Sequence, residues 1–383
     1  MKQYIIVISV ALCLVSCSHR SKHWETLAQV ESYIEERPDS ALNVLQGMDK
    51  GELSGKEEKA KHALLLSMAM DKNYIDRTDF DVLQPAIDFY EDHGSATDKL
   101  RTYYYQGRIY QNAGNDAAAM ESFVNSLDMG SESNDNLTKA RILVAQSNIY
   151  YSLMKWEKVC DVNIEAANYY NELGRTNNYV YCLLRCIGGY IQSNNFDKAK
   201  DLLGKCYQYT ENLPELLISE IYSYHLLYSV AANNFESVPL IIGEYKNKVS
   251  EENIDYLTVA GAYADIGAYD KAEDMLVRIN TKSLEDNNKT LKYYTTLIRI
   301  YRHKGDYRKV YESYLKFNEL NDSILFSIFE SDTQFIEERH ALEMQKAKET
   351  EAKNRLTIIV LACVIALMSS LYILNFIRKR LKE

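Results

Sequence analysis

Proline and glycine are scarce in this chain of 383 residues, which has only 4 prolines and 15 glycines. Both residue types disturb helices, proline because it lacks a backbone N–H and glycine because of its conformational freedom. Their scarcity indicates long, uninterrupted helices. A chain of this length could hold two or three ordinary domains, but a tandem array of helical repeats can also run this long as one cooperative body.

The chain also has no excess of positive charge. The chain has 44 lysines and arginines against 54 aspartates and glutamates, which gives a net charge of -10. A body this acidic repels phosphate backbones, so nucleic acid is not an expected partner of the folded part.

Catalytic and cofactor-binding motifs are absent too. The sequence contains no HExxH, GxSxG, P-loop or GxGxxG pattern, and its seven histidines are scattered singly. Catalysis needs groups that converge, whereas carboxylate pairs such as Glu337 and Glu338 fit solvated helix faces. We therefore expect no enzyme, no cofactor and no metal.

Four cysteines lie in the middle of the chain, at Cys160, Cys182, Cys186 and Cys206. Cys182 and Cys186 are one helical turn apart, a spacing that could hold a metal, but no histidine or CxxC pattern accompanies them. Buried small apolar side chains are the favoured interpretation. A disulfide stays open as the alternative, and so does the redox state of all four thiols.

What the chain has in abundance is a repeating helical pattern. Within residues 103–127 it places a small residue, an aromatic, a turn glycine and a second small and large pair at Gly107, Tyr110, Gly114, Ala119 and Phe123. These are the offsets of a helix-turn-helix repeat, and here the chain resembles the tetratricopeptide repeat family. The resemblance implies an all-α fold, a right-handed α-solenoid that binds proteins.

The aromatic position recurs along the chain and marks each repeat. Its successive occupants are Tyr110, Tyr150, Tyr190, Ser229, Tyr263 and Tyr301. The numbers of these markers differ by 40, 40, 39, 34 and 38 in turn, and we expect a turn to begin shortly after each marker. Most of these intervals exceed the family's usual period of about 34, which implies longer helices or loops between units.

The pattern divides the chain into regions. Residues 17–95 read as atypical N-terminal helical repeats, which suits the end of a solenoid, and they include a helix over Phe80–Tyr90 whose start Pro85 could delay. Residues 96–322 form the tetratricopeptide-like array, and a break is expected at Asn318–Ser323. Residues 323–355 then form a charged juxtamembrane stalk helix without a sustained apolar heptad.

The N-terminus reads as an export signal. Residues 1–16 hold one early lysine and an apolar run that is too short to span a bilayer. The stretch from Leu14 to Cys17 resembles the bacterial lipobox, which implies that Cys17 is lipidated and becomes the mature N-terminus. An ordinary signal peptide with an incidental cysteine is the alternative.

The C-terminal region reads as a membrane anchor. The stretch 356–376 contains no charged residue, and as a helix it covers about 30 Å, the thickness of a hydrocarbon core. The short basic tail at 377–383 favours the cytoplasmic side, so we expect a bacterial inner-membrane protein with its repeats in the periplasm. A stripe of small residues, Ala362, Ala366 and Ser370, could let two such helices pair as a homodimer.

The family resemblance also implies a binding groove. In this family the first helix of each unit lines the concave face, and its inward positions map onto Arg101, Tyr104, Arg108, Gln111, Arg141, Asn148, Arg299 and Arg302. Arginines that face one groove could bind the carboxylates of a peptide or an acidic sugar through paired hydrogen bonds. The alternative is that arginine suits exposed helix faces and pairs with neighbouring acids.

Signal peptide, periplasmic repeats, stalk and span together resemble a class of bacterial membrane regulators with tetratricopeptide repeats. Longer members of that class continue into a cytoplasmic output domain. We therefore expect a non-enzymatic sensor or adaptor that binds a protein or peptide and lacks that output. A structural scaffold that tethers an envelope complex for uptake or secretion to the membrane is the alternative.

Overall fold

The computed structural model describes residues 22–279, 284 and 287–380, and within those ranges every regular element is a helix. The chain divides into two compact units, Met1–Phe329 and Glu330–Glu383, which are described separately. The predicted signal peptide at 1–16 and the predicted lipidation site Cys17 lie outside the described residues. The all-α class is confirmed for the part that the structure describes.

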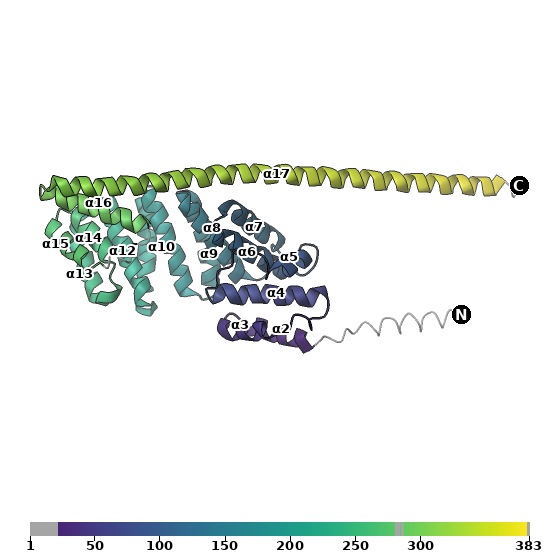
Figure 1. The fold of residues 1–383 in the computed structure, drawn as a ribbon, viewed down its shortest axis with the longest axis horizontal. Coiled ribbons are helices and arrows are strands. Elements are labelled where there is room, and N and C mark those ends of the chain that lie inside the picture. The colour runs from purple at the N-terminus through teal and green to yellow at the C-terminus, as the bar shows by residue number, and fades with distance from the viewer. Residues whose placement is uncertain (1–21, 280–283, 285–286, 381–383) are drawn as a thin grey trace. The chain divides into compact units, whose positions relative to one another are not determined.

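The helices of the first unit follow one another in pairs (Figure 1). The first helices of the pairs are α2 (Lys22–Tyr33), α4 (Gly55–Lys72), α6 (Ala96–Asn112), α8 (Asn136–Ser152), α10 (Thr176–Gln192), α12 (Glu215–Ala231), α14 (Tyr256–Asp265) and α16 (Asn287–His303). The second helices are α3 (Pro38–Gln46), α5 (Gln84–Tyr90), α7 (Asp116–Met129), α9 (Trp156–Glu172), α11 (Phe196–Tyr207), α13 (Val238–Lys248), α15 (Tyr269–Val277) and α17 (Tyr307–Arg380). Short 3-10 helices occur at Thr210–Asn212, Phe235–Ser237 and Glu251–Asn253.

Packing between pairs places the first helices side by side. Helix α6 contacts α4 and α8, and helix α12 contacts α10 and α14, in addition to the contacts that each makes within its own pair. This stacking is the architecture of a helical repeat array, in which each unit buries its apolar surface against its neighbours. We call the face that the first helices form the inner face.

A residue in the left-handed backbone region recurs at the turn between the two helices of a pair. These residues are Tyr74, Gly114, Met154, Asn194, Asn233, Gly267 and Gly305, with φ between 53° and 77°. From Gly114 onward their spacing repeats that of the markers, 40, 40, 39, 34 and 38, which confirms the expected turns. Tyr74 precedes Gly114 by the same interval that separates Gly114 from Met154, so the regular register begins one repeat earlier than the sequence predicts.

The crossing of α6 and α7 depends on Gly107 and Phe123, as the repeat pattern predicts. A Cβ added at Gly107 would overlap the Phe123 ring, which is fully buried. The missing side chain therefore lets the aromatic ring fill the space between the two helices, and this is how small and large positions of the repeat complement each other.

The repeat with the irregular marker Ser229 is held by Tyr245 of α13. Its hydroxyl lies 2.5 Å from Ser219 Oγ of α12 and accepts a hydrogen bond of 2.8 Å from the backbone N–H of Asp255, at the start of α14. The ring stacks on Tyr222 with 5.2 Å between centroids. One side chain therefore links three consecutive helices where the sequence pattern is weakest.

Replacing Tyr245 with phenylalanine is expected to lower the free energy of unfolding by about 1–3 kcal/mol, because it removes the hydroxyl that accepts from the Asp255 N–H and contacts the buried Ser219 hydroxyl. Urea unfolding followed by circular dichroism measures the change. Tyr228→Phe is the matched control, since the Tyr228 hydroxyl makes no hydrogen bond to a described residue, and it should change stability little. Equal losses in the two variants would contradict the assignment.

One helix starts late, as Pro85 made possible, and one expected break is absent. Helix α5 begins at Gln84, with Pro85 in its first turn, because proline is tolerated there and not in a helix interior. The break expected at Asn318–Ser323 is absent, since α17 runs continuously through these residues. Asparagine disfavours a helix only mildly, and neither proline nor glycine occurs there.

Among the described residues, no helix has both the length and the apolar content that crossing a bilayer requires. Residues 356–376, predicted to span a membrane, continue α17 without interruption from the charged residues before them. This finding overturns the predicted localisation in an inner membrane with periplasmic repeats. Of the predicted packing stripe, Ala362 lies on α17, and the side chains of Ala366 and Ser370 lie outside the described residues.

Candidate functional site

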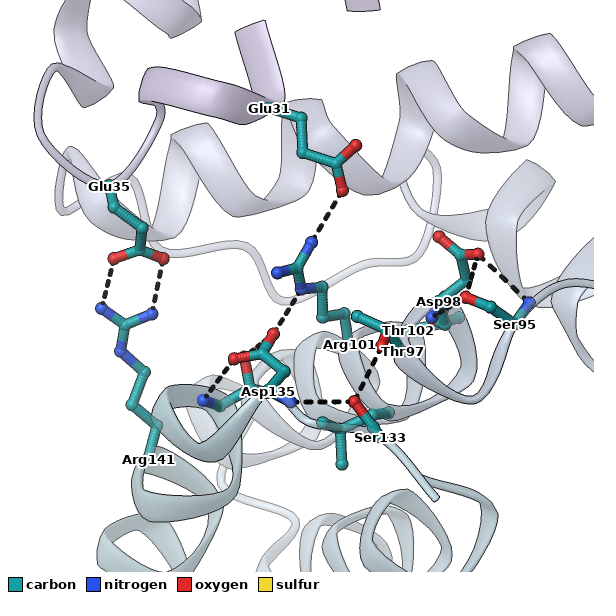
Figure 2. A network of polar contacts seen from close by, with 12 residues as sticks. Glu31, Glu35, Ser95, Thr97, Asp98, Arg101, Thr102, Ser133, Asp135 and Arg141 are labelled. Atoms are coloured by element: carbon teal, nitrogen blue, oxygen red, sulfur yellow. Dashed lines mark hydrogen bonds and ion pairs between the residues drawn. The ribbon is translucent and has the colours of Figure 1, made fainter. Parts of the chain in front are cut away.

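The inner face formed by α2, α4, α6 and α8 carries a network of ion pairs (Figure 2). Arg141 of α8 donates to both carboxylate oxygens of Glu35, at 2.8 and 2.7 Å, and Lys72 of α4 donates to the same carboxylate at 2.6 Å. Glu35 lies in the turn after α2, 106 residues from Arg141 in the sequence. The first and fourth helix pairs are therefore joined by a bidentate ion pair.

A second branch of the network centres on Arg101 of α6. Its Nε donates to Asp135 at 2.6 Å and its Nη1 donates to Glu31 of α2 at 2.7 Å (Figure 2). Asp135 also caps the N-terminus of α8, where its side chain accepts from the backbone N–H of Thr138. Lys61 of α4 donates to Glu31 as well, at 2.8 Å. The Asp135 and Glu31 carboxylates therefore each accept hydrogen bonds from at least two donors.

The remaining predicted groove residues of α6 are also engaged. Arg108 donates from Nε to Asp71 of α4 at 3.0 Å and from Nη1 to Gln111 at 2.6 Å. Tyr104 is only 6% exposed and lies 6.2 Å from the Phe123 ring between centroids. Tyr104 therefore belongs to the packed interior, whereas Arg108 and Gln111 lie on the inner face and are hydrogen-bonded to each other.

Charge is balanced across this half of the inner face. The network pairs five cations with five anions: Lys61, Lys72, Arg101, Arg108 and Arg141 with Glu31, Glu35, Asp71, Asp98 and Asp135. The predicted arginines are thus already satisfied by the chain's own carboxylates. Their role in binding a partner stays a prediction, and the structure assigns them contacts that hold the first four helix pairs together.

The network lowers the pKa values of the Glu35 and Asp135 carboxyls. Burial alone would raise the pKa of the Glu35 carboxyl, but the hydrogen bonds and charges of Arg141 and Lys72 outweigh burial and lower that pKa to about 2. Burial likewise opposes ionisation of Asp135, and the Arg101 charge and the bonds from Thr138 lower its pKa. Both carboxylates are therefore charged at neutral pH and strengthen the ion pairs.

At the far end of the array the two predicted arginines differ. Arg299 of α16 forms an ion pair with Asp265 of α14. Arg302 is exposed and makes no ion pair or hydrogen bond with a described residue, while its neighbour His303 stacks on Tyr269 with 4.3 Å between ring centroids. The structure does not bring these arginines together with Arg101 or Arg141 in one network.

The middle of the inner face contains a charged residue that the sequence did not single out, Arg185 of α10. Its guanidinium lies over the Tyr151 ring, 4.1 Å from the centroid, and its Nη2 lies 3.4 Å from Oδ1 of Asn148, a predicted groove residue. Arg185 has no carboxylate within ion-pair distance among the described residues, and its Nε has no hydrogen bond to them. Arg185 falls outside the family's inward positions, so the repeat pattern carried no signal for it.

The four cysteines of the repeat region are free and buried. Burial raises the pKa of the Cys182 and Cys206 thiols to about 12. Such thiols stay protonated at neutral pH and are poor nucleophiles. This agrees with the interpretation of Cys182 and Cys206 as small apolar core residues.

Comparison with known proteins shows similarity in fold. No family model and no curated protein matches the chain. Among solved structures, the apo form of RapI superposes with a TM-score of 0.58 at 13% identity, covering 79% of this chain and 98% of that one. A Rap protein complexed with Competence and Sporulation Factor gives 0.54 at 15% identity, covering 83% of this chain and 93% of that one.

A third structure, the apo form of the quorum sensor NprR from B. thuringiensis, gives a TM-score of 0.50 at 13% identity and covers 81% of this chain and 95% of that one. Identities this low establish the fold alone. The chain therefore shares the tetratricopeptide-like helical architecture of these proteins.

Proposed function

We propose that this chain is a non-enzymatic interaction module of a signalling system, which holds a protein or peptide partner on its inner face. The observation that carries the proposal is the difference between two parts of that face. The half from α2 to α8 is neutralised by its own ion pairs, whereas the half-buried Arg185 of α10, beside the exposed Asn148 at the edge of that half, has no carboxylate partner among the described residues. Ion pairs that connect four helix pairs would preorganise the surface on which Arg185 lies, and preorganisation lowers the cost of binding.

The solved structures of similar fold support the same proposal. One of them is a Rap protein with its Competence and Sporulation Factor bound, and another is a quorum sensor. Binding of a partner by a helical repeat array is therefore compatible with this architecture, and the inner face of the present chain offers the chemistry for it.

Site-specific photocrosslinking in cells tests the proposal without disturbing the ion pairs. A photoreactive phenylalanine analogue replaces Asn148 on the inner face, or Lys200 at an exposed position of the second helix α11 as the matched control. We expect one discrete adduct from position 148 and none from position 200. Adducts from 200 alone, or from neither position, would contradict an inner-face partner.

A second candidate, a scaffold that organises an assembly, is favoured by exposed aromatics on α17. Tyr307, Tyr311 and Tyr314 follow helical spacing and are 74%, 63% and 51% exposed. Exposed aromatic stripes of this kind often mark interaction surfaces. The same photoreactive analogue at Tyr311 decides between the candidates, since a scaffold predicts an adduct there and none at 148.

A further inference from the structure

We propose that Arg185, stacked on Tyr151 beside Asn148, is the position at which the inner face binds a carboxylate of its peptide or protein partner. The proposal rests on the proposed function and specifies the chemistry of the partner, an acidic segment. The three residues come from the consecutive first helices α8 and α10, so the array holds them in one place on the inner face.

The comparison with the other arginines of the inner face identifies Arg185. Arg101, Arg108 and Arg141 each donate to at least one carboxylate, at distances from 2.6 to 3.0 Å. All of these carboxylates belong to the chain itself. The pairs show that arginines on the inner face bind carboxylates. Arg185 has the same guanidinium and lacks such an acceptor among the described residues.

The environment of Arg185 orients its free donors. A guanidinium stacked on an aromatic ring is held by cation–π attraction, and its donors lie in the plane of the fork. The Nε of Arg185 is buried, so the two terminal nitrogens are the ones that could donate to a partner. The single polar contact to a described residue, Asn148 at 3.4 Å, is long for a hydrogen bond of this type. A carboxylate could therefore take two parallel hydrogen bonds from this fork, which is the arrangement that Arg141 makes with Glu35.

The other groups around Arg185 define the electrostatics of the position. Glu220 of α12 lies near enough to interact with the Arg185 charge but forms no ion pair with it. Burial raises the pKa of the Glu220 carboxyl, and the charges of Arg185 and Lys289 of α16 oppose that rise. Glu220 therefore competes with an incoming carboxylate for Arg185, and its removal should strengthen binding.

Space for the rest of the partner lies beside the stack. Tyr151 also lines a cavity of about 610 Å³, together with Trp156, Gln192 and Ser323. The described residues around this cavity include no charged side chain. A partner segment that places its acid on Arg185 can therefore continue into neutral, partly aromatic surroundings.

Binding of a capped tetraglutamate peptide to the full chain, measured by isothermal titration calorimetry at low salt, tests the proposal. Capped tetraglutamine is the neutral control peptide. We expect Arg185→Gln to weaken tetraglutamate binding about tenfold or more, because one charge-assisted pair is lost. Glu220→Gln should strengthen binding, and Arg175→Gln, which removes an exposed arginine just before α10, should leave it unchanged.

The outcomes separate this proposal from the proposed function. Tetraglutamate binding that Arg185→Gln leaves unchanged, or that tetraglutamine matches, would overturn the carboxylate position, and so would the absence of any binding. The adduct at position 148 decides independently whether the inner face holds a partner. Unchanged urea unfolding of Arg185→Gln shows that a loss of binding does not come from misfolding.

Discussion

Replacing Phe123 with alanine is expected to lower the free energy of unfolding by about 3–5 kcal/mol, the largest effect that we predict for a single substitution. The Phe123 ring is fully buried and fills the space that Gly107 leaves open between α6 and α7. Alanine would remove the ring and leave a cavity, since the backbone at Gly107 has no side chain with which to fill it. Urea unfolding followed by circular dichroism at neutral pH measures the loss.

Val124→Ala is the matched control for Phe123→Ala. Val124 is the next residue of the same helix and is 45% exposed, so its truncation should cost less than about 1 kcal/mol. A small effect at both positions would mean that the crossing of α6 and α7 does not depend on the ring.

Replacing Glu35 with glutamine is expected to destabilise the protein by about 2–3 kcal/mol at pH 7, and the effect should depend on pH. The folded-state pKa of Glu35 is lowered from 4.5 to about 2. A carboxyl whose pKa is lowered on folding contributes stability above its unfolded value. That contribution is lost as the pH falls from about 4.5 towards 2.

The difference in unfolding free energy between the wild type and Glu35→Gln should therefore be largest near pH 7 and shrink below pH 4.5. Urea unfolding of both proteins between about pH 7 and pH 3 measures it. Glu36→Gln, which changes the adjacent exposed carboxyl, should show little difference at any pH. A Glu35→Gln effect of constant size across this range would exclude the charge of Glu35 as its cause.

Much of the fold could be predicted from local patterns. The turn residues Gly114, Met154, Asn194, Asn233, Gly267 and Gly305 fall where the aromatic markers place them. Helix length and the position of a left-handed turn depend on residues a few positions apart, so a single sequence carries that information. The repeat with its turn at Tyr74 was expected to be atypical, because its marker position holds Met70 rather than an aromatic.

The candidate site was less accessible to sequence reasoning. The inward positions singled out Arg101, Arg108 and Arg141 as groove residues, but they do not reveal which carboxylates of the chain pair with these charges. Arg185 was missed because it lies outside those positions and reaches the inner face through a long, flexible side chain. The predicted membrane span failed for a different reason. A run of apolar residues predicted a localisation that the described helices do not support.

The sequence by itself determined the class of fold, the register of the repeats from Gly114 onward and the packing of Gly107 against Phe123, because each follows from contacts between residues close in the chain. Only the tertiary structure decided which charges are neutralised. Glu35 and Arg141 are 106 residues apart and meet because four stacked helix pairs bring them together, a contact that depends on the accumulated geometry of every packing interface between them.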